Sequence, residues 1–549
     1  MDGLGNAETS DKPSEILLEE QSREQQSRKQ SAPTSVGLFQ SILAEHQLCG
    51  DSSSDRDRSD DDRDPLREFL SEVPNHLALG HQWSRWMAKL SLWLGSDHLR
   101  RMQSREDVAQ QLDRDIALID RLIGRQLNAI LHHPAFQKLE ASWRGLHHLV
   151  VCQEKANDDL IKIKVWNATW RMLRDDLEGA VEFDQSQFFK KIYEQGIGTA
   201  GADPFSALLV DFEIHPRPSR EHKFDDVPLL QAMSATAAAA FAPIFTGAHP
   251  SMFQIDQYAD LKPSSPIETM HAQADFLSWR SFRQMEESRF VTLLLPRMLI
   301  RQPYRPEVNY EFGFLFEETT ATSEDYLWGN PIWGMGEVLI RAFAESRWFA
   351  NIRGLTQGEN TGGLVRGPAH EVFLTETRSS APKPITETII SDQFERRLTR
   401  LGFTPMCATK FGSEAVFYSI ASAQQPKRYN DQVASTNAEL SALTNYILCA
   451  SRFGHYVKFL SREKIGSLIG AYDIETYLSD WLMSYVNRDP DASVSARASA
   501  PLLDASVEVN EKLGKPGDYD CVIQLEPFHG FDDVRATVKL DTRLTRSRR

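Results

Sequence analysis

Three short segments near the C-terminal end of the chain alternate between apolar and polar residues with a period of two. They are Ser506–Glu511, Tyr519–Leu525 and Val534–Leu544, and the turn-forming run Lys515–Asp518 (KPGD) separates the first two. Such alternation is typical of half-buried strands, so we predict a small three-stranded meander. A sheet of this size has two open edges, which invite strand addition by another chain unless something covers them.

The middle of the chain predicts a mixed α/β region. Two apolar runs, Ala207–Ile214 and Phe290–Leu295, suit buried strands, and an alanine-rich helix is expected between them at Val227–Phe241. Leu160–Val165 alternates and predicts a further strand, whereas Gln185–Gln195 predicts a helix. Further helices are expected at 434–460 and 474–486. The fold class expected from these segments is α/β (α+β).

Two amphipathic helices are expected before this region. Apolar residues recur at spacings of three and four in both, and Pro134 separates them. The first helix carries Leu112, Ile116, Ile119, Ile123, Leu127 and Ile130, and the second carries Phe136, Leu139, Trp143, Leu146 and Val150. Because the two helices join across His132-His133-Pro134, we predict a helical hairpin or corner.

The first sixty-five residues differ from the rest of the chain. The polar segment 1–35 and the run Asp51–Asp64, with seven acids and three arginines, cannot bury enough apolar surface to offset the entropy cost of ordering. Between them, apolar residues share one helical face, which predicts a short amphipathic helix at 36–48. This helix either docks on its own domain or serves as a linear recognition motif.

These patterns predict four regions. A disordered leader with its short helix occupies 1–65, and a helical region occupies 66–150. A mixed α/β body follows over 151–500, and the C-terminal β-meander occupies 501–549.

Composition narrows the class of protein. The chain of 549 residues has 61 basic and 77 acidic residues, and a net charge of −16 argues against nucleic-acid binding. Five cysteines without a C-x-x-C pair make a disulfide framework or a zinc knuckle unexpected and favour a reducing compartment. The sequence has no run of 18 apolar residues, so we expect no transmembrane helix. No signal peptide is visible either, and we therefore expect a cytoplasmic protein.

Motif searches identify no catalytic, cofactor-binding or metal-binding residues. A phosphate loop, H-E-x-x-H and G-x-S-x-G are all missing from the sequence. Gly196–Gly201 matches G-x-G-x-x-G, but a helical segment precedes it and a strand follows, the reverse of a dinucleotide site. The adjacent pairs His132-His133 and His147-His148 cannot each present two ligands on one helical face, so we interpret them as surface or core histidines.

Several stretches of the sequence, taken in order, resemble a known family. The run 125–146 reads RQLNAILHHPAFQKLEASWRGL, and it is followed by DPFSALLVDFEI (203–214), LPRMLIRQPY (295–304), YLWGN (326–330), ASRFGHYVK (450–458) and KPGDY (515–519). These stretches resemble the large-subunit family of the type VI secretion contractile sheath (TssC, also called VipB or EvpB). The resemblance extends from Pro65 to Leu544, although 305–316 departs from the acidic, glycine-containing stretch that the family often carries.

The resemblance implies a structural protein of the bacterial cytoplasm, without catalytic activity or a cofactor. Its implied partners are the small sheath subunit (TssB or VipA), further copies of itself in a helical polymer, the Hcp inner tube, the baseplate and the ClpV unfoldase. Neither nucleic acid nor membrane insertion is implied. Two alternatives stay open: a non-polymerising baseplate or adaptor paralogue, and a nucleotide-binding enzyme that uses Gly196–Gly201.

The resemblance also implies two sets of site residues. The C-terminal meander resembles the family's intersubunit sheet, which assigns intersubunit strands to Val507, Val509, Ile523, Leu525, Val534, Val538 and Leu540. The leader helix resembles the segment that ClpV grips, with an expected contact face of Val36, Leu38, Phe39, Ile42 and Leu43.

Overall fold

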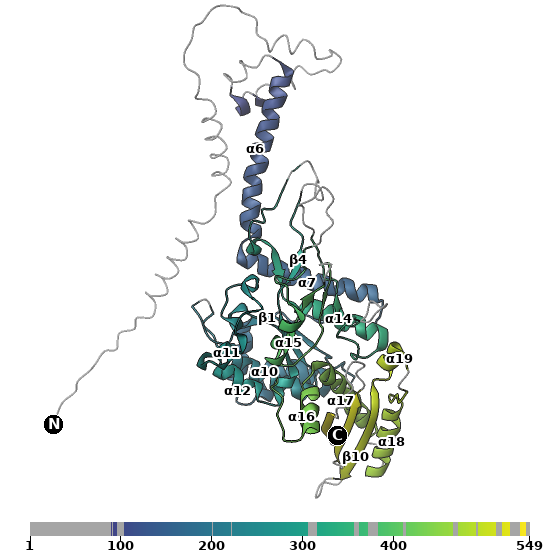
Figure 1. Ribbon diagram of the computed structural model, residues 1–549. Coiled ribbons are helices and arrows are strands. Elements are labelled where there is room, and N and C mark those ends of the chain that lie inside the picture. Colours follow the sequence, from purple (N-terminus) through teal and green to yellow (C-terminus); the bar gives the residue numbers. More distant parts are fainter. Residues whose placement is uncertain are drawn as a thin grey trace, which may run out of the picture. The chain divides into compact units, whose positions relative to one another are not determined.

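Figure 1 shows the computed structural model, in which the described residues divide into two units: those up to 126 together with 314 and 316, and the others from 127 onward. The structure describes residues 89–90, 92–95, 104–199, 201–220, 222–305, 314, 316–355, 362–371, 383–409, 413–464, 470–489, 492–511, 519–527 and 538–544. The predicted leader, with its helix at 36–48, lies outside these residues.

In the first unit, a capped helix carries a buried carboxylate. Helix α6 (Arg105–Leu131) belongs mostly to this unit and continues into the second. Ser104 and Asp107 cap its start reciprocally, since each backbone N–H donates to the other's side chain. About two turns after Asp107, Asp115 is buried and accepts a hydrogen bond of 2.8 Å from the Trp93 indole. The capping fixes where α6 begins.

The second unit is built on a buried parallel sheet. Its strand order is β1-β2-β3-β7, with β1 at Leu208–Ile214, β2 at Ile244–Ala248, β3 at Val291–Leu295 and β7 at Phe403–Pro405. Helix α10 (Asp226–Ala240) connects β1 to β2. Every residue of β2, β3 and β7 is buried. The run Phe290–Leu295 is confirmed as the buried strand β3, because a strand covered on both faces needs apolar residues throughout, and the alanine-rich helix is confirmed as α10. The run Ala207–Ile214 forms strand β1 as expected, but β1 lies at the edge of the sheet and only Ile214 in it is fully buried.

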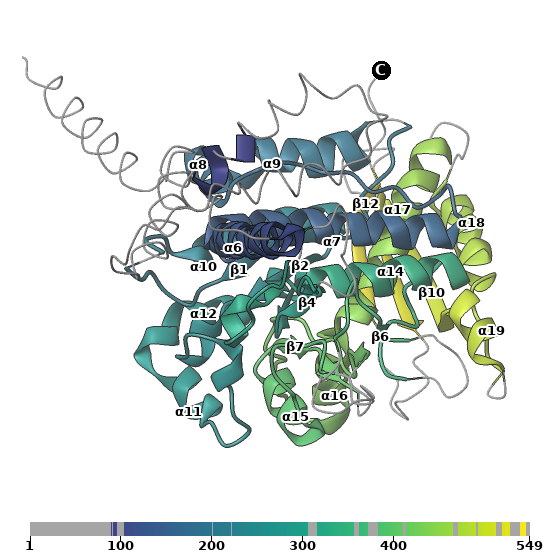
Figure 2. The ribbon, with the colours of Figure 1, turned by 90° about the horizontal axis from the view of Figure 1, so that it is seen from above.

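Successive residues of the sheet contribute to two different cores. Ile244 and Leu293 lie in the core that includes α10, whereas Phe245 and Leu294 lie in the core that includes α7 (Pro134–Ala156) and α14 (Ile332–Ser346). Helices α7 and α14 run side by side (Figure 2). The expected pair of N-terminal helices is confirmed: α6 ends at Leu131, and α7 begins at Pro134 with His133 as its N-cap.

Shorter elements complete the second unit. The helices are α8 (Trp170–Gly179), α9 (Gln187–Phe189), α11 (Ile267–Ala272), α12 (Leu277–Arg283), α15 (Asp392–Arg400), α16 (Gln432–Ser441), α17 (Thr444–Lys464), α18 (Ala471–Met483) and α19 (Val494–Ser499). Single helical turns lie at Phe183–Gln185, Pro250–Phe253, Tyr258–Asp260, Ala274–Phe276, Glu287–Phe290 and Ser323–Asp325, and a π-helix at Lys190–Gly198. The remaining strands of the body are β4 (Met298–Arg301), β5 (Leu327–Gly329), β6 (Leu364–Val365), β8 (Cys407–Ala408) and β9 (Ala415–Val416).

Three expected elements differ from the structure. Leu160–Val165 forms no strand: Ile163 packs on the α7–α14 core, but the segment pairs with no strand among the described residues. Gln185–Gln195 is helical but changes from α to π geometry at Lys190. The helix expected over 434–460 is two helices, because Ala442 O accepts from Ser422 N and Thr444 N donates to Ile420 O, which interrupts the helical ladder.

The crossing of α7 and α14 requires glycine on both helices. A Cβ on Gly145 of α7 would overlap the Trp333 ring of α14, and a Cβ on Gly336 of α14 would lie 2.7 Å from Leu149 Cδ2. A side chain at either position would therefore force the two helices apart.

We predict that Gly145→Ala lowers the free energy of unfolding by about 1–3 kcal/mol, the usual cost of overpacking a core. Thermal unfolding of the variant measures the shift. Gly179→Ala in α8 is the matched control, because nothing lies within 4 Å of the added Cβ. Equal midpoints for the two variants would contradict the close crossing.

Three histidines of the second unit resist protonation: His271 is buried, and His249 and His455 are half-buried. Burial lowers the pKa of His249, His271 and His455 to about 4, and the neighbouring cations Arg297, Arg283 and Lys458 respectively lower it further. Acceptors near them, Glu213, Glu268 and the Ala240 carbonyl, oppose this only in part. Each histidine is therefore neutral in the folded protein at pH values where the unfolded chain takes up a proton.

We predict that acid destabilises the protein between about pH 6.5 and about pH 4. In this window the unfolded state binds more protons, so each such histidine removes up to about 1.4 kcal/mol of stability per pH unit as the pH falls. Urea unfolding at a series of pH values measures the slope. In the His271→Leu variant, the free energy of unfolding should fall less steeply with pH, by the contribution of one histidine. Parallel curves for variant and wild type would refute the lowered pKa of His271.

Candidate intersubunit interface

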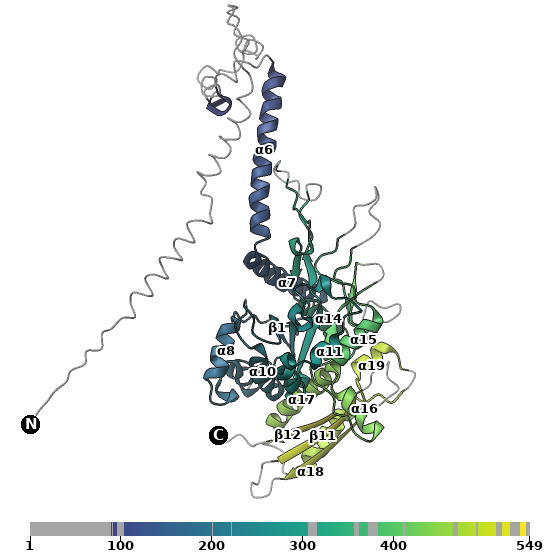
Figure 3. The ribbon, with the colours of Figure 1, turned by 60° about the vertical axis from the view of Figure 1, so that its left-hand side comes forward.

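The three C-terminal strands form the predicted antiparallel meander. Strand β10 (Leu502–Glu511) pairs with β11 (Tyr519–Pro527), which pairs with β12 (Val538–Leu544). Figure 3 shows the sheet with α17 and α18, and these helices contact β12 and β10 respectively. In the described residues this sheet is separate from the parallel sheet of the body.

One face of the sheet belongs to the subunit's own core. Alternate side chains of β10 and β11 are buried against α17 and α18. The strand residues are Leu502, Ala505, Val509, Cys521, Ile523 and Leu525, and they pack with Phe453, Val457, Ile474, Leu478 and Leu482 of the helices. In β10 and β11, the side chains on this face are therefore used within the subunit.

The structure brings most of the predicted interface residues together. Val509, Ile523 and Leu525 are buried in that core, and Val507 is half-buried against it. Val538 and Leu540 lie opposite Leu525 and Ile523 in the β11–β12 register. Val534 lies outside the described residues. The buried residues can therefore contact a neighbouring chain only through backbone groups, not through their side chains.

Backbone hydrogen bonding shows which way each strand's N–H groups point. In an antiparallel pair, these groups point alternately toward the partner strand and away from it. Leu502 N donates to Tyr485 O at 3.2 Å and Val509 N to Glu475 Oε2 at 3.1 Å, so both point away from β11. The outer edge of β10 is thus partly covered by its own subunit.

The same alternation fixes the orientation of β12. Cys521 lies opposite Val509 and opposite Thr542, so its N–H points toward β12. The backbone donors of Lys539, Asp541 and Arg543 consequently point away from β11. Within the described part of the chain, no strand pairs with this outer edge. It is therefore the edge most open to another chain.

Three buried thiols are held in the protonated form: Cys521 in the sheet, Cys449 in α17 behind it, and Cys407 in β8 of the body. Burial raises the pKa of Cys521 to about 12, and the nearby Glu475 carboxylate adds to the effect. Burial likewise raises the pKa of Cys407 and of Cys449 to about 12. These cysteines stay protonated at neutral pH and lack the thiolate that metal binding or disulfide exchange requires.

An aromatic cluster joins the helices behind the sheet to the rest of the second unit, and sequence reasoning missed it. Trp348, which follows α14, stacks on Phe453 of α17 with ring centroids 4.4 Å apart, and Tyr485 meets both rings edge-on. The Arg452 guanidinium lies 5.2 Å from the Trp348 ring centroid. Local patterning could not reveal it, because Trp348 is more than a hundred residues from both Phe453 and Tyr485.

Two groups among the described residues have side chains that could hold a metal ion. One is His148, Cys152 and Glu337, and the other is His215, His222 and Asp226. The first was missed in the sequence, where the spacing of four between His148 and Cys152 was the available signal.

The second group is better explained as a capped carboxylate. The His215 and His222 rings stack at 4.1 Å and 10°, so their nitrogens lie side by side and do not converge on one point. Each donates to Asp226, which also accepts from the Trp170 indole at 2.5 Å. Burial would raise the pKa of Asp226, but the hydrogen bonds from His215, His222 and Trp170 lower it. Asp226 is thus an anion at the start of α10 whose acceptors are already used.

The remaining predicted features are placed as follows. Val36, Leu38, Phe39, Ile42 and Leu43 lie outside the described residues. Gly196 and Gly198 end the π-helix that precedes β1. A helix before the glycines and a strand after them reverse the order that a dinucleotide site needs. No helix among the described residues is long and apolar enough to cross a membrane.

Comparison with known proteins identifies the family. Residues 113–424 match the EvpB/VC_A0108 tail sheath N-terminal domain, and residues 433–544 match the EvpB/VC_A0108 tail sheath gpW/gp25-like domain. The chain is 34% identical over 443 residues to the type VI secretion system sheath protein TssC1 of Pseudomonas aeruginosa, covering 80% of this chain and 86% of that protein. The second match includes α17 and α18 together with the three strands.

A solved structure is also similar. The sheath tail protein of Desulfitobacterium hafniense aligns over 70% of this chain and 62% of its own length, with 9% identity and a TM-score of 0.32. The two domain matches define a tail sheath protein. The chain belongs to the EvpB/VC_A0108 family and is the large subunit of a type VI secretion contractile sheath.

Proposed function

We propose that the chain assembles into the sheath by strand addition at the outer edge of β12. The observation that supports this is that β12 has no strand partner on its outer edge among the described residues. One face of the same sheet is packed against α17 and α18, which holds the strands in place. An added strand would come from the small sheath subunit or from a neighbouring copy. The resulting polymer surrounds the Hcp tube, starts at the baseplate and forms in the bacterial cytoplasm.

Backbone pairing suits a polymer that changes its packing when it contracts. A backbone hydrogen bond contributes about 0.5–1.5 kcal/mol net, and it is independent of side-chain identity. Side-chain contacts between subunits can therefore rearrange while the strands stay paired. The protonated thiols and the reversed glycine motif support a structural role without catalysis or a cofactor, and they disfavour the nucleotide-binding alternative.

We predict that Asp541→Pro abolishes tubule formation when the chain is co-expressed with the small sheath subunit. Proline removes an outward donor and places its ring in the path of an added strand, but spares the bonds between β12 and β11. Loss of about 1–2 kcal/mol per contact lowers the pairing constant about 5–30-fold, and the loss repeats at every subunit. Negative-stain microscopy of the co-expressed proteins gives the readout.

Asp541→Ala is the matched control, because it removes the same side chain and keeps the backbone donor. Its tubules should be normal. Tubules from Asp541→Pro at the wild-type level would rule out this edge. A wild-type chain that binds the small subunit without any tubules would favour the adaptor alternative.

We further propose that the leader helix at 36–48 is the contact of the ClpV unfoldase. The support is the resemblance of this segment to the one that ClpV grips in the family, together with an amphipathic face between two polar, charged segments. A helix of this length is marginal in isolation and gains stability when it packs on a partner. It can therefore be masked in one sheath state and offered in the other.

A peptide spanning residues 30–50 should bind the N-terminal domain of the cognate ClpV, as measured by fluorescence anisotropy. A peptide with Phe39→Ser and Ile42→Ser should bind at least about 10-fold more weakly, because two buried apolar side chains are lost. Gln40→Ser, on the same helix, serves as the control. Equal binding by all three peptides, or none by any, would refute the assignment.

A further inference from the structure

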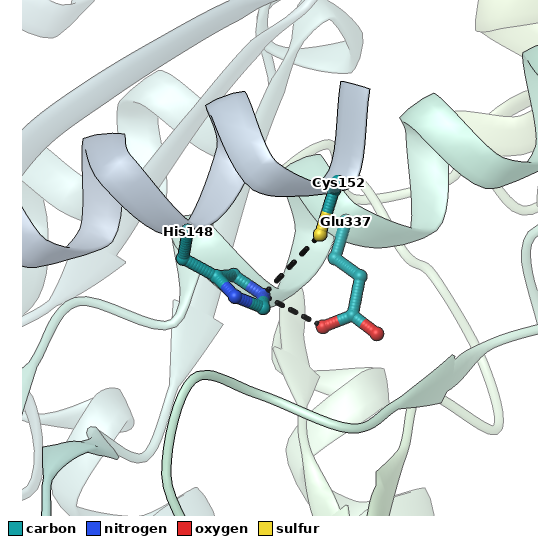
Figure 4. Close-up of side chains that lie close together, drawn as sticks. All are labelled: His148, Cys152 and Glu337. Atoms are coloured by element: carbon teal, nitrogen blue, oxygen red, sulfur yellow. Dashed lines mark hydrogen bonds and ion pairs between the residues drawn. The ribbon is translucent and has the colours of Figure 1, made fainter. Parts of the chain in front are cut away.

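Three side chains with metal-binding atoms meet between α7 and α14. His148 and Cys152 lie one turn apart on α7, and Glu337 approaches them from α14 (Figure 4). His148 Nε2 lies 3.0 Å from Glu337 Oε2 and 3.7 Å from Cys152 Sγ. The three ligand atoms all lie within 4.8 Å of one another. Both neighbours face the same imidazole nitrogen.

This arrangement differs from that of a nucleophilic cysteine. In a catalytic Cys–His–carboxylate array, the thiol meets one ring nitrogen and the carboxylate holds the other. Here the thiol and the carboxylate converge on Nε2, so a single positively charged species can lie between all three atoms. That species is either a proton or a metal ion.

The distances fit a tetrahedral ion. Bonds of about 2.0–2.1 Å from zinc to nitrogen or oxygen and about 2.3 Å to sulfur place neighbouring ligand atoms about 3.4–3.6 Å apart. The two measured separations from Nε2, 3.0 and 3.7 Å, bracket this range. Small side-chain adjustments therefore bring the three atoms to coordination distance. A water molecule would take the fourth position.

The surrounding groups orient the carboxylate as a second coordination shell does. Glu337 Oε1 accepts from Arg366 N and Glu337 Oε2 from Gly367 N, both at 3.1 Å. These bonds fix the carboxylate without using the side of Oε2 that faces His148. The His148 and Glu337 side chains are 11% and 8% exposed, and Cys152 is half-buried, which leaves a path for an ion.

We propose that His148, Cys152 and Glu337 form a zinc site that clamps α7 to α14. A ligand set with one nitrogen, one sulfur and one oxygen suits the borderline softness of zinc. The thiolate and the carboxylate together balance the charge of the dication. On binding, the proton between the ligands and the thiol proton pass to solvent.

The site is remote in sequence from β12 and its test requires no polymer, so it stands apart from the proposed assembly edge.

The test uses the full chain co-purified with the small sheath subunit, stripped with a chelator and titrated with Zn²⁺ against a chromogenic competitor. We expect one strongly bound ion per chain. Co²⁺ in place of zinc should give a thiolate-to-cobalt charge-transfer band in the near ultraviolet and the intense visible bands of tetrahedral cobalt. Absence of stoichiometric binding overturns the proposal and leaves a protonated ion pair.

Variants assign the ligands. Cys152→Ser and His148→Gln should each weaken zinc binding by more than about 100-fold. Loss of a residue that only hydrogen-bonds to a ligand costs about 10–100-fold, so loss of a ligand should cost more. Cys152→Ser should also abolish the charge-transfer band. His147→Gln is the matched control, because His147 directly precedes His148 on α7 and its side chain is exposed. Equal affinity in Cys152→Ser and His147→Gln, with both variants folded by circular dichroism, would place any bound zinc elsewhere and overturn the proposal.

Discussion

The second unit depends on the close crossing of α7 and α14 over the parallel sheet. Gly145 admits the Trp333 ring, and Gly336 admits Leu149 and Leu209. This contact lets one face of the sheet bury Phe245 and Leu294 under two helices that are far apart in sequence. His148 of α7 and Glu337 of α14 also meet between these helices. Close packing at the glycines and the contact between these two side chains therefore both hold α7 against α14.

The C-terminal sheet divides its two kinds of interaction between the subunit and its surroundings. Side chains of β10 and β11 pack on α17 and α18, whereas the outer backbone edge of β12 pairs with no strand in the part of the chain that the structure describes. In the assembly proposed above, a neighbour would add hydrogen bonds to a sheet whose side chains are already packed within its own subunit.

Local periodicity predicted much of this structure, and long-range contacts escaped prediction. The apolar runs at β1 and β3, the alanine-rich α10 and the three C-terminal strands follow from residue spacing. Leu160–Val165 alternates in the same way but has no strand partner, because pairing depends on distant segments. Glu337 likewise could not be linked to Cys152, since 185 residues separate the two. The break between α16 and α17 arises from Ile420 and Ser422, which local sequence does not reveal.

The burial of Cys521 has a consequence for the reversibility of assembly. This residue lies in β11, one strand away from the open edge, where chains from different subunits would come together. Its thiol is 1% exposed and held in the protonated form. Neighbouring subunits consequently cannot become covalently linked through it, even during a period of oxidation. The Cys521 thiol therefore adds no covalent bond that a reductant would have to break before paired strands could separate.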